Sequence, residues 1–320
     1  MFLASFLIGL REGLEAALIV GILVAVTQRR RRPEALNKIT WGVGSAIGLS
    51  ILLGAVFTFT AYSLSETGEQ IFAGIMSLAA VGMITWMIFW MITAGRHLRS
   101  HLESEANTAL ALGTSWAMFW IAFISVGREG LETTIMLWSS LTQPEALFGA
   151  VVGLLAAVAL GYLVYRGLVR VNLGTFFTVT GIVLVIAAAG IAAHGIHELQ
   201  EAAFLPGPYS GPPIAPTDLI TGAVAVGLTG GPFWLASFPF GWAFDLTATI
   251  DPSTWGAALV KALLGVTPRM SWLEVIAWLG YLGFVLPKFL SRTPRRRSGA
   301  PEVDKPAPAE LMAWAQAQQD

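Results

Sequence analysis

The chain contains no cysteine and few charged residues. Asp, Glu, Lys and Arg make up 12% of its 320 residues, whereas a soluble domain carries about 25%. The absence of cysteine excludes disulfides, thiolate metal sites and thiol catalysis. The chain is 55% hydrophobic, and its mean hydropathy is +0.67. This composition predicts an all-α polytopic membrane protein in contact with lipid, and the net charge of −1 gives no sign of a nucleic-acid partner.

Long apolar segments recur along the chain, and each has about the 20 residues that a bilayer-spanning helix needs. We predict seven transmembrane helices, over residues 2–26, 39–62, 70–94, 114–140, 146–165, 173–195 and 271–290. With the N-terminus outside and the C-terminus inside, most Lys and Arg residues fall on the inner side, and Lys261 and Arg269 fall outside. This distribution follows the positive-inside rule and predicts the orientation.

The predicted orientation also divides the chain into regions. Residues 1–292 form the membrane domain, in which 196–270 are an external connection rich in Pro and Gly at its start. Residues 293–320 form a basic and then Pro/Ala-rich tail in the cytoplasm.

Charged residues occur in the middle of two of the apolar segments. The sequence REGLE stands at residues 11–15 and again at 128–132. The first copy lies in a span predicted to run inward, and the second lies three spans later, in one predicted to run outward. We therefore predict that spans 1–3 and 4–6 are inverted repeats, with a binding site near the membrane midplane where the repeats meet.

Each motif places its functional groups on one helical face. The residues are Arg11, Glu12, Gly13 and Glu15 in the first copy and Arg128, Glu129, Gly130 and Glu132 in the second. Residues three or four apart are neighbours on a helix, so both glutamates can point the same way and the arginine can hold the second one. The glycine leaves room for another helix to approach closely.

The excess of acid over base indicates a cation. Each charge at the membrane centre costs about 2.5–3.5 kcal/mol even on insertion scales. Ion pairs that only lock the bundle would explain two of the four glutamates, because the motifs hold two arginines. Carboxylate oxygens suit Mg, Ca, Mn and oxidised iron better than Cu(I). The motifs therefore predict a multivalent-cation site formed by Glu12, Glu15, Glu129 and Glu132.

Two R-E-x-x-E motifs in the first and fourth of seven predicted helices resemble the high-affinity iron permeases, which include the fungal oxidase-coupled permease and the bacterial EfeU-type transporter. The resemblance covers all the predicted spans. It implies a transporter, not an enzyme, that imports iron across the cell (inner) membrane. Iron would be the transported substrate, the four glutamates its ligands, and no bound cofactor is expected. The resemblance also implies protein partners that oxidise or deliver iron at the outer face.

A second polar group closes the sixth predicted span. The sequence HGIHELQE at 194–201 puts four potential ligands on one helical face: His194, His197, Glu198 and Glu201. The resembling family has acidic E-x-x-E-like outer sites, and Glu198 with Glu201 fits that pattern. We predict that this group captures metal at the outer face, and the alternative is an ordinary polar helix end in water.

Other acidic residues have simpler interpretations. Glu66 and Glu69 lie just before the third predicted span, at its external mouth, and form another outer pair, although acids in a first helical turn also complement the helix dipole. Glu274 follows Ser271 by three residues, which predicts a capping box that opens the seventh span.

Three alternatives to iron import remain open on the sequence. One is a permease for another divalent cation such as Mn, Pb or Zn. A second is copper, since Met83, Met87 and Met91 form a stripe that could bind Cu(I), although Met is also a common gap-filler between helices. The third is a membrane-bound iron oxidoreductase, which is disfavoured because the spans contain no haem-type histidine pair and the chain has no nucleotide-binding loop.

Overall fold

Long helices form most of the structure, a computed structural model. It describes residues 2–94, 104–108, 115–138, 144–166, 173–227, 237–250, 254, 256, 260, 261 and 264–292. The predicted tail, 293–320, lies outside the described residues. The long helices are α1 (Phe2–Arg29), α2 (Pro33–Tyr62), α3 (Glu66–Ala94), α5 (Ser115–Trp138), α6 (Pro144–Tyr165), α7 (Leu173–Glu201) and α10 (Trp272–Arg292).

Each long helix overlaps one of the predicted spans. Within the described residues, five of them, α2, α3, α6, α7 and α10, are long and apolar enough to cross a membrane. The other two, α1 and α5, carry the motifs, and the three charges of each motif lower the hydropathy of the helix. Both helices nevertheless run through their motifs without a break.

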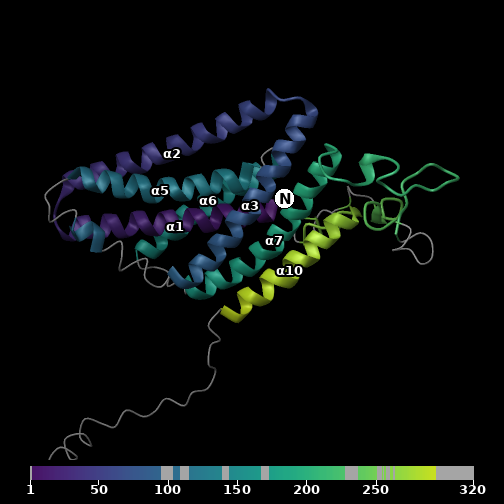
Figure 1. Cartoon of the computed structure of the whole chain (residues 1–320). Helices are drawn as coiled ribbons and strands as arrows, with labels where there is room; N and C mark the ends of the chain where they lie inside the picture. Colours follow the sequence, from purple (N-terminus) through teal and green to yellow (C-terminus); the bar gives the residue numbers. More distant parts are fainter. Residues whose placement is uncertain are drawn as a thin grey trace, which may run out of the picture.

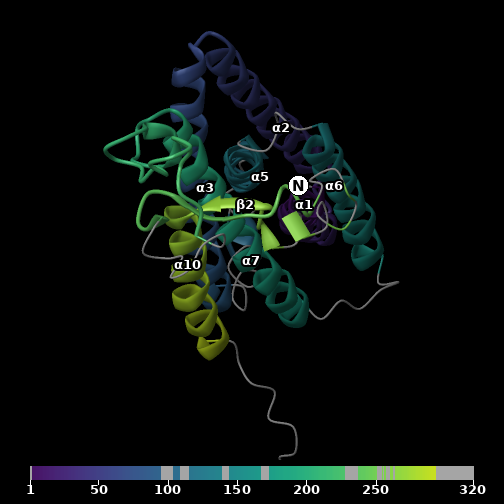
Figure 2. The same cartoon turned by 90° about the vertical axis from the view of Figure 1, so that its right-hand side faces the viewer.

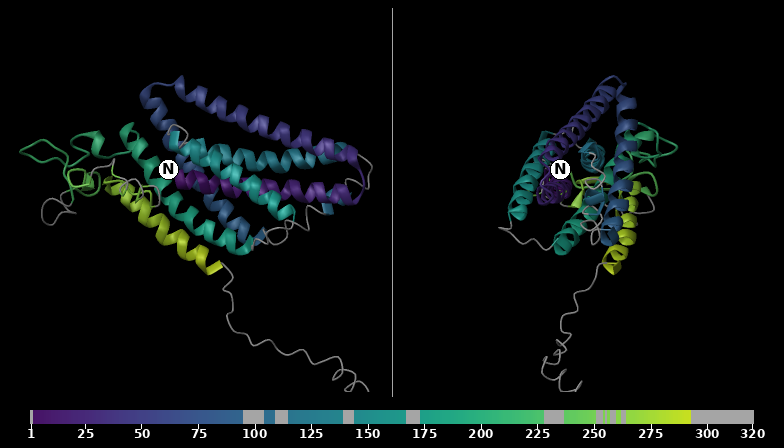
Figure 3. Two further views of the ribbon diagram at one scale, coloured as in Figure 1. Left: turned by 180° about the vertical axis from the view of Figure 1, so that it is seen from behind. Right: turned by 90° about the vertical axis from the view of Figure 1, so that its left-hand side faces the viewer.

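The helices form one elongated bundle (Figure 1), which Figure 3 shows from behind and from its other end. Seen along the bundle, α5 lies at the centre, with α1, α2 and α6 on one side and α3, α7 and α10 on the other (Figure 2). α1 packs mainly against α6, α2 against α5, and α3 against α7, while α10 lies against α7. α1 and α5 also contact each other, so the two helices that carry the motifs are neighbours.

Glycine contacts join α1 to α6 and α5 to α2. A Cβ atom added to Gly13 would lie 2.8 Å from the Cβ of Ala157, and one added to Gly130 would collide with Ser50 Oγ. Two further pairs of contacts correspond when the motifs are aligned: Gly161–Ala17 with Gly54–Thr134, and Gly149–Phe2 with Gly42–Phe119. The glycines of both motifs therefore lie where helices approach closely, as predicted.

The main apolar core joins α3, α7 and α10. It includes Ile84, Leu184 and Phe289, and the methionines of the α3 stripe pack in it: Met87 and Met91 are buried, and Met83 is partly buried. Their environment is that of gap-filling side chains. The core gives no support to the copper alternative.

The prediction of an all-α protein is incomplete in the segment between α7 and α10. This segment contains the 3-10 helix η1 (Pro208–Ser210) and two short strands, β1 (Trp242–Asp245) and β2 (Arg269–Ser271), that pair antiparallel. It extends from the end of the bundle where α7 ends and α10 begins (Figure 1). Pro and Gly residues disfavour helix here, and the short strand pair forms part of the backbone hydrogen bonding instead.

The end of α7 also differs from the prediction. The helix continues to Glu201, whereas the expected span ended at residue 195. It ends where Ala203 adopts a left-handed backbone conformation, with φ 56°. The polar residues 194–201 are therefore part of the helix, and the connection begins after them.

Candidate metal site

The carboxylates of the two motifs meet between α1 and α5. Glu12, Glu15 and Glu129 are buried, and each offers an oxygen that lies within 4.8 Å of the oxygens of the other two. A cation bound at about 2.0–2.6 Å from each oxygen can contact all three across such a distance. The sequence predicted a site made by both motifs, and the structure brings these three glutamates together.

Glu132 is the predicted ligand that lies outside this group of three. It is buried, and its Oε1 accepts a hydrogen bond of 2.8 Å from Arg128 Nε. In the other motif, Arg11 Nε lies 3.4 Å from Glu15 Oε1. Both Arg–Glu pairs expected from the four-residue spacing are therefore present.

Several polar atoms of the site are buried without a hydrogen-bond partner among the described residues. They are Glu12 Oε1 and Oε2, Glu15 Oε1, Glu132 Oε2, and Arg11 Nε and Nη1. An unpaired buried polar group costs about 1–3 kcal/mol, and more when it is charged. A cation bound by these carboxylate oxygens would offset this cost.

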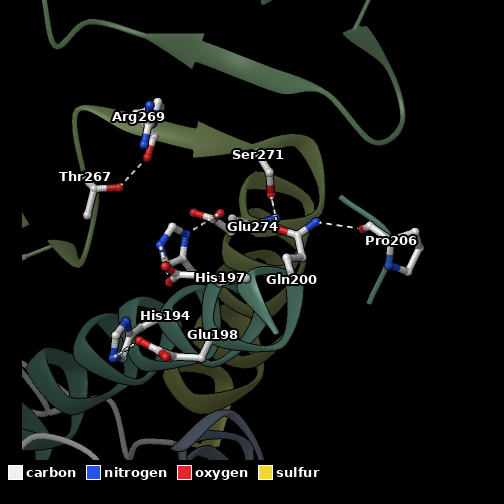
Figure 4. Close-up of polar contacts among 10 residues, drawn as sticks. His194, His197, Glu198, Gln200, Pro206, Thr267, Arg269, Ser271 and Glu274 are labelled. Atoms are coloured by element: carbon white, nitrogen blue, oxygen red, sulfur yellow. Dashed lines mark hydrogen bonds and ion pairs between the residues drawn. The ribbon is translucent and has the colours of Figure 1, made fainter. Parts of the chain in front are cut away.

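A second polar site lies at the end of α7 (Figure 4). His194 Nε2 lies 3.6 Å from Glu198 Oε1, and His197 Nε2 lies 3.8 Å from Glu201 Oε2. His194 and Glu198 line a cavity of about 300 Å³ together with Glu66 and Glu69 of α3. We call this the α3–α7 cavity; Gln70, Ala73 and Trp138 complete its lining. The acids at the start of α3 therefore face the predicted metal-capture group.

His197 has a different partner. Its Nδ1 lies 3.1 Å from Oε1 of Glu274, a buried residue of α10. Ser271 Oγ accepts a hydrogen bond from the Glu274 backbone N–H, which is half of the predicted capping box. The carboxylate does not complete the box but pairs with His197 (Figure 4). Sequence reasoning missed this pair, because an acid in a first helical turn does not reveal which distant residue it meets.

The same network fixes the end of α7 to the segment that follows it. Ser271 Oγ donates to Gln200 Oε1 at 2.7 Å, and Gln200 Nε2 donates to the carbonyl oxygen of Pro206 at 2.9 Å. Both bonds are drawn in Figure 4. The position of His197 and its neighbours therefore depends on α10 as well as on α7.

Comparison with known proteins identifies the family. The description "Iron permease FTR1 family" belongs to the family model that matches residues 2–207, a range that holds both motifs and the end of α7. The chain belongs to the iron permease FTR1 family. The resemblance to iron permeases is thereby confirmed.

The similar proteins are named permeases. The ferrous iron permease EfeU of Escherichia coli O6:K15:H31 is 32% identical over 301 residues, which cover 91% of this chain and 98% of that protein. EfeU of Yersinia pestis is 34% identical over 202 residues, 62% of this chain and 72% of that protein. A protein of Escherichia coli K12 named putative inactive ferrous iron permease EfeU is 32% identical over 302 residues, with coverage of 91% and 98%. No solved structure matches the chain.

The family and the apolar helices together make this chain a membrane permease. The prediction of a transporter rather than an enzyme is confirmed, because the relatives are transporters by name.

Proposed function

We propose that the chain imports iron through a site made by the carboxylates of its two REGLE motifs. The observation that carries the proposal is the group of three buried glutamates, Glu12, Glu15 and Glu129, with oxygens within 4.8 Å of one another. Glu132, held by Arg128, stands beside them as a fourth carboxylate. The membership in an iron permease family supports iron as the substrate.

All seven long helices span the membrane in this proposal, with the start of α1 outside and the end of α10 inside. The charges in α1 and α5 are buried and paired within the bundle, which lowers the cost of placing them in lipid. Basic residues at helix ends on the proposed inner side, such as Arg29, Arg166 and Arg292, support the orientation. The membrane is the inner (plasma) membrane of the cell.

The spans form two inverted repeats, α1–α3 and α5–α7, with α10 added to them. The helix packing supports this, because the first helix of each repeat packs against the second helix of the other repeat: α1 against α6, and α5 against α2. The matching contacts of Gly13 with Ala157 and of Gly130 with Ser50 support it at residue level. The site lies between α1 and α5, the first helices of the two repeats, as such an architecture favours.

Iron first meets the α3–α7 cavity, whose carboxylates and His194 collect the cation at the outer face. It then passes to the motif site and leaves to the cytoplasm. An inside-negative potential draws it inward by about 2.3 kcal/mol per charge for each 100 mV. An outer protein that oxidises or delivers iron would meet the chain at the segment between α7 and α10, which lies on this side.

Uptake into proteoliposomes that contain the purified full chain tests the proposal. We expect Glu12→Gln and Glu129→Gln to abolish uptake at every iron concentration, because each removes a charged ligand and keeps the size. Glu34→Gln is the matched control, since Glu34 is exposed at the start of α2. Normal uptake by both site variants would exclude the motif site.

The same vesicles distinguish iron from the other divalent cations. Carboxylate oxygens also bind Mn and other hard or borderline cations, so Mn, Pb and Zn should be supplied in competition with iron. We expect iron to be transported in preference to all three. Preferred transport of one of the others would assign the chain to that metal instead.

A further inference from the structure

Arg11 and Arg128 have different surroundings although the two motifs have the same sequence. The side chain of Arg11 is 1% exposed, whereas that of Arg128 is 37% exposed. Arg11 Cζ lies 5.9 Å from the centre of the Phe177 ring. Arg128 Cζ lies 4.4 Å from the centre of the Trp90 ring, which is well within the range of a cation–π interaction. The second arginine therefore has a closer aromatic partner than the first.

Trp90 comes from α3, outside the helix that carries the motif. A second ring of the same helix, Trp86, lies 5.6 Å from Arg128 Cζ and is stacked on Trp90 with ring centres 6.4 Å apart. The Arg128 side chain meets two groups at once, because its Nε donates to Glu132 and its guanidinium lies over the Trp90 ring. A planar guanidinium is suited to this double role.

We propose that Trp90 is a positioning residue for iron transport, which holds Arg128 on Glu132 and away from the group of three carboxylates. The inference rests on the proposed motif site. Without the ring, a partly exposed guanidinium would be drawn toward the carboxylates of Glu15 and Glu129, the excess negative charge of the site. There it would compete with the incoming cation for the same oxygens.

This competition predicts which transport parameter changes. Trp90→Leu removes the ring and keeps an apolar side chain, so we expect the apparent affinity for iron to fall about three- to tenfold, between the scales of an exposed and a desolvated cation–π interaction. Saturating iron displaces the arginine, so the maximal rate should be retained. A purely structural role would instead lower the amount of active protein and hence the maximal rate, with the apparent affinity unchanged.

Uptake curves over a wide iron range, in proteoliposomes containing the full chain, make the test. Trp90→Phe should restore most of the apparent affinity, because it keeps a ring. Trp41→Leu is the matched control: Trp41 is 65% exposed on α2 and lies on a helix that does not carry a motif. Wild-type affinity in Trp90→Leu, or a loss of maximal rate alone, would overturn the proposal.

A second measurement keeps the test decisive if Trp90→Leu does not insert. Tryptophan analogues with increasing ring fluorination, placed at position 90, weaken the negative face of the ring with little change in size. The apparent affinity should fall stepwise with fluorination, and a flat series would overturn the role of Trp90. Glu129→Gln is measured alongside: if it transports normally the motif site itself is wrong, whereas its loss with a flat series refutes only the positioning role.

Discussion

His197 of α7 and Glu274 of α10 are hydrogen-bonded to each other, with Nδ1 of the histidine 3.1 Å from Oε1 of the glutamate. Glu274 occupies one ring nitrogen of His197, so His194 is the histidine more available to bind a metal ion. His194, His197 and Glu198 also line a smaller cavity of about 200 Å³, and Glu201 Oε2 lies 3.8 Å from His197 Nε2, but the other contacts of these residues differ. His194 and Glu198 line the α3–α7 cavity, and His197 belongs to the contact between α7 and α10.

Removing Glu274 should therefore reduce stability more than iron capture. Glu274→Ala leaves His197 without its buried partner, and we expect a loss of about 1–3 kcal/mol in the free energy of unfolding. Thermal unfolding in detergent measures the loss, and uptake measures the apparent affinity. His197→Ala combined with Glu274→Ala should cost less than the sum of the single variants, because the two share one interaction. A strong fall in affinity at unchanged stability would instead make Glu274 a metal ligand.

The α3–α7 cavity should set the apparent affinity for iron. His194→Ala, Glu198→Gln and Glu69→Gln each remove a group that lines it, so we expect a lower apparent affinity with a nearly unchanged maximal rate. A site at the mouth sets capture, whereas the site deeper in the bundle sets passage. Glu201 was also predicted to capture metal but does not line the cavity, so Glu201→Gln on the same helix end should change the apparent affinity less. Equal effects of all four variants would show a general charge effect and not a site.

The sequence predicted the helices well because their signal is local. Apolar runs of bilayer length and the spacing within REGLE depend on neighbours along the chain, and both Arg–Glu pairs formed as expected. The helical face predicted for residues 194–201 is also local, and α7 includes all of them, although the apolar run alone would end the span at residue 195.

Contacts between distant helices could not be predicted in this way. The spacing within a motif puts Glu12 and Glu15 on one face, but it does not give their distance from Glu129, which depends on how α1 and α5 cross. The partner of Glu274 lies 77 residues away. The rings beside Arg128 come from α3, in a stretch whose aromatic residues the sequence alone does not distinguish from lipid-facing ones.

Arg128→Lys should reduce iron uptake although the charge is retained. An ammonium group can bind Glu132 or lie over the Trp90 ring, but it lacks the planar fork that does both. The loss of one charge-assisted hydrogen bond is worth about 1.5–3 kcal/mol, so we expect uptake at low iron to fall about tenfold or more. Arg166→Lys is the control, because Arg166 is exposed at the end of α6 and its Nε donates to Tyr162. Wild-type uptake by Arg128→Lys would mean that the arginine acts as a point charge alone.

Gly130→Ala should disturb the contact between α5 and α2 that carries the second motif. The added Cβ would collide with Ser50 Oγ and would lie 3.1 Å from Ser50 Cβ. Either Ser50 Oγ gives up its hydrogen bond to the Ala46 carbonyl oxygen or the helices separate, and overpacking of this kind costs about 1–3 kcal/mol. Separation would also move Glu129 relative to the α1 carboxylates, and we expect uptake and thermal stability to fall together. Gly48→Ala is the matched control, because a Cβ at that position of α2 meets nothing within 4 Å.

A compensating change separates the packing effect from any direct role of Gly130. Ser50→Gly removes both atoms that the new Cβ would meet, so the double variant Gly130→Ala with Ser50→Gly should recover uptake and most of the lost stability. The corresponding contact of the first motif gives an independent check: Gly13→Ala would place its Cβ 2.8 Å from both the Cβ of Ala157 and Cδ1 of Leu154. Ala157→Gly should relieve the first contact, and the end of the Leu154 side chain can rotate to relieve the second. If neither second change restores uptake, close packing is not the reason for the glycine in REGLE. Recovery in both motifs would instead show that the two halves of the bundle use the same contact to hold their carboxylates in place.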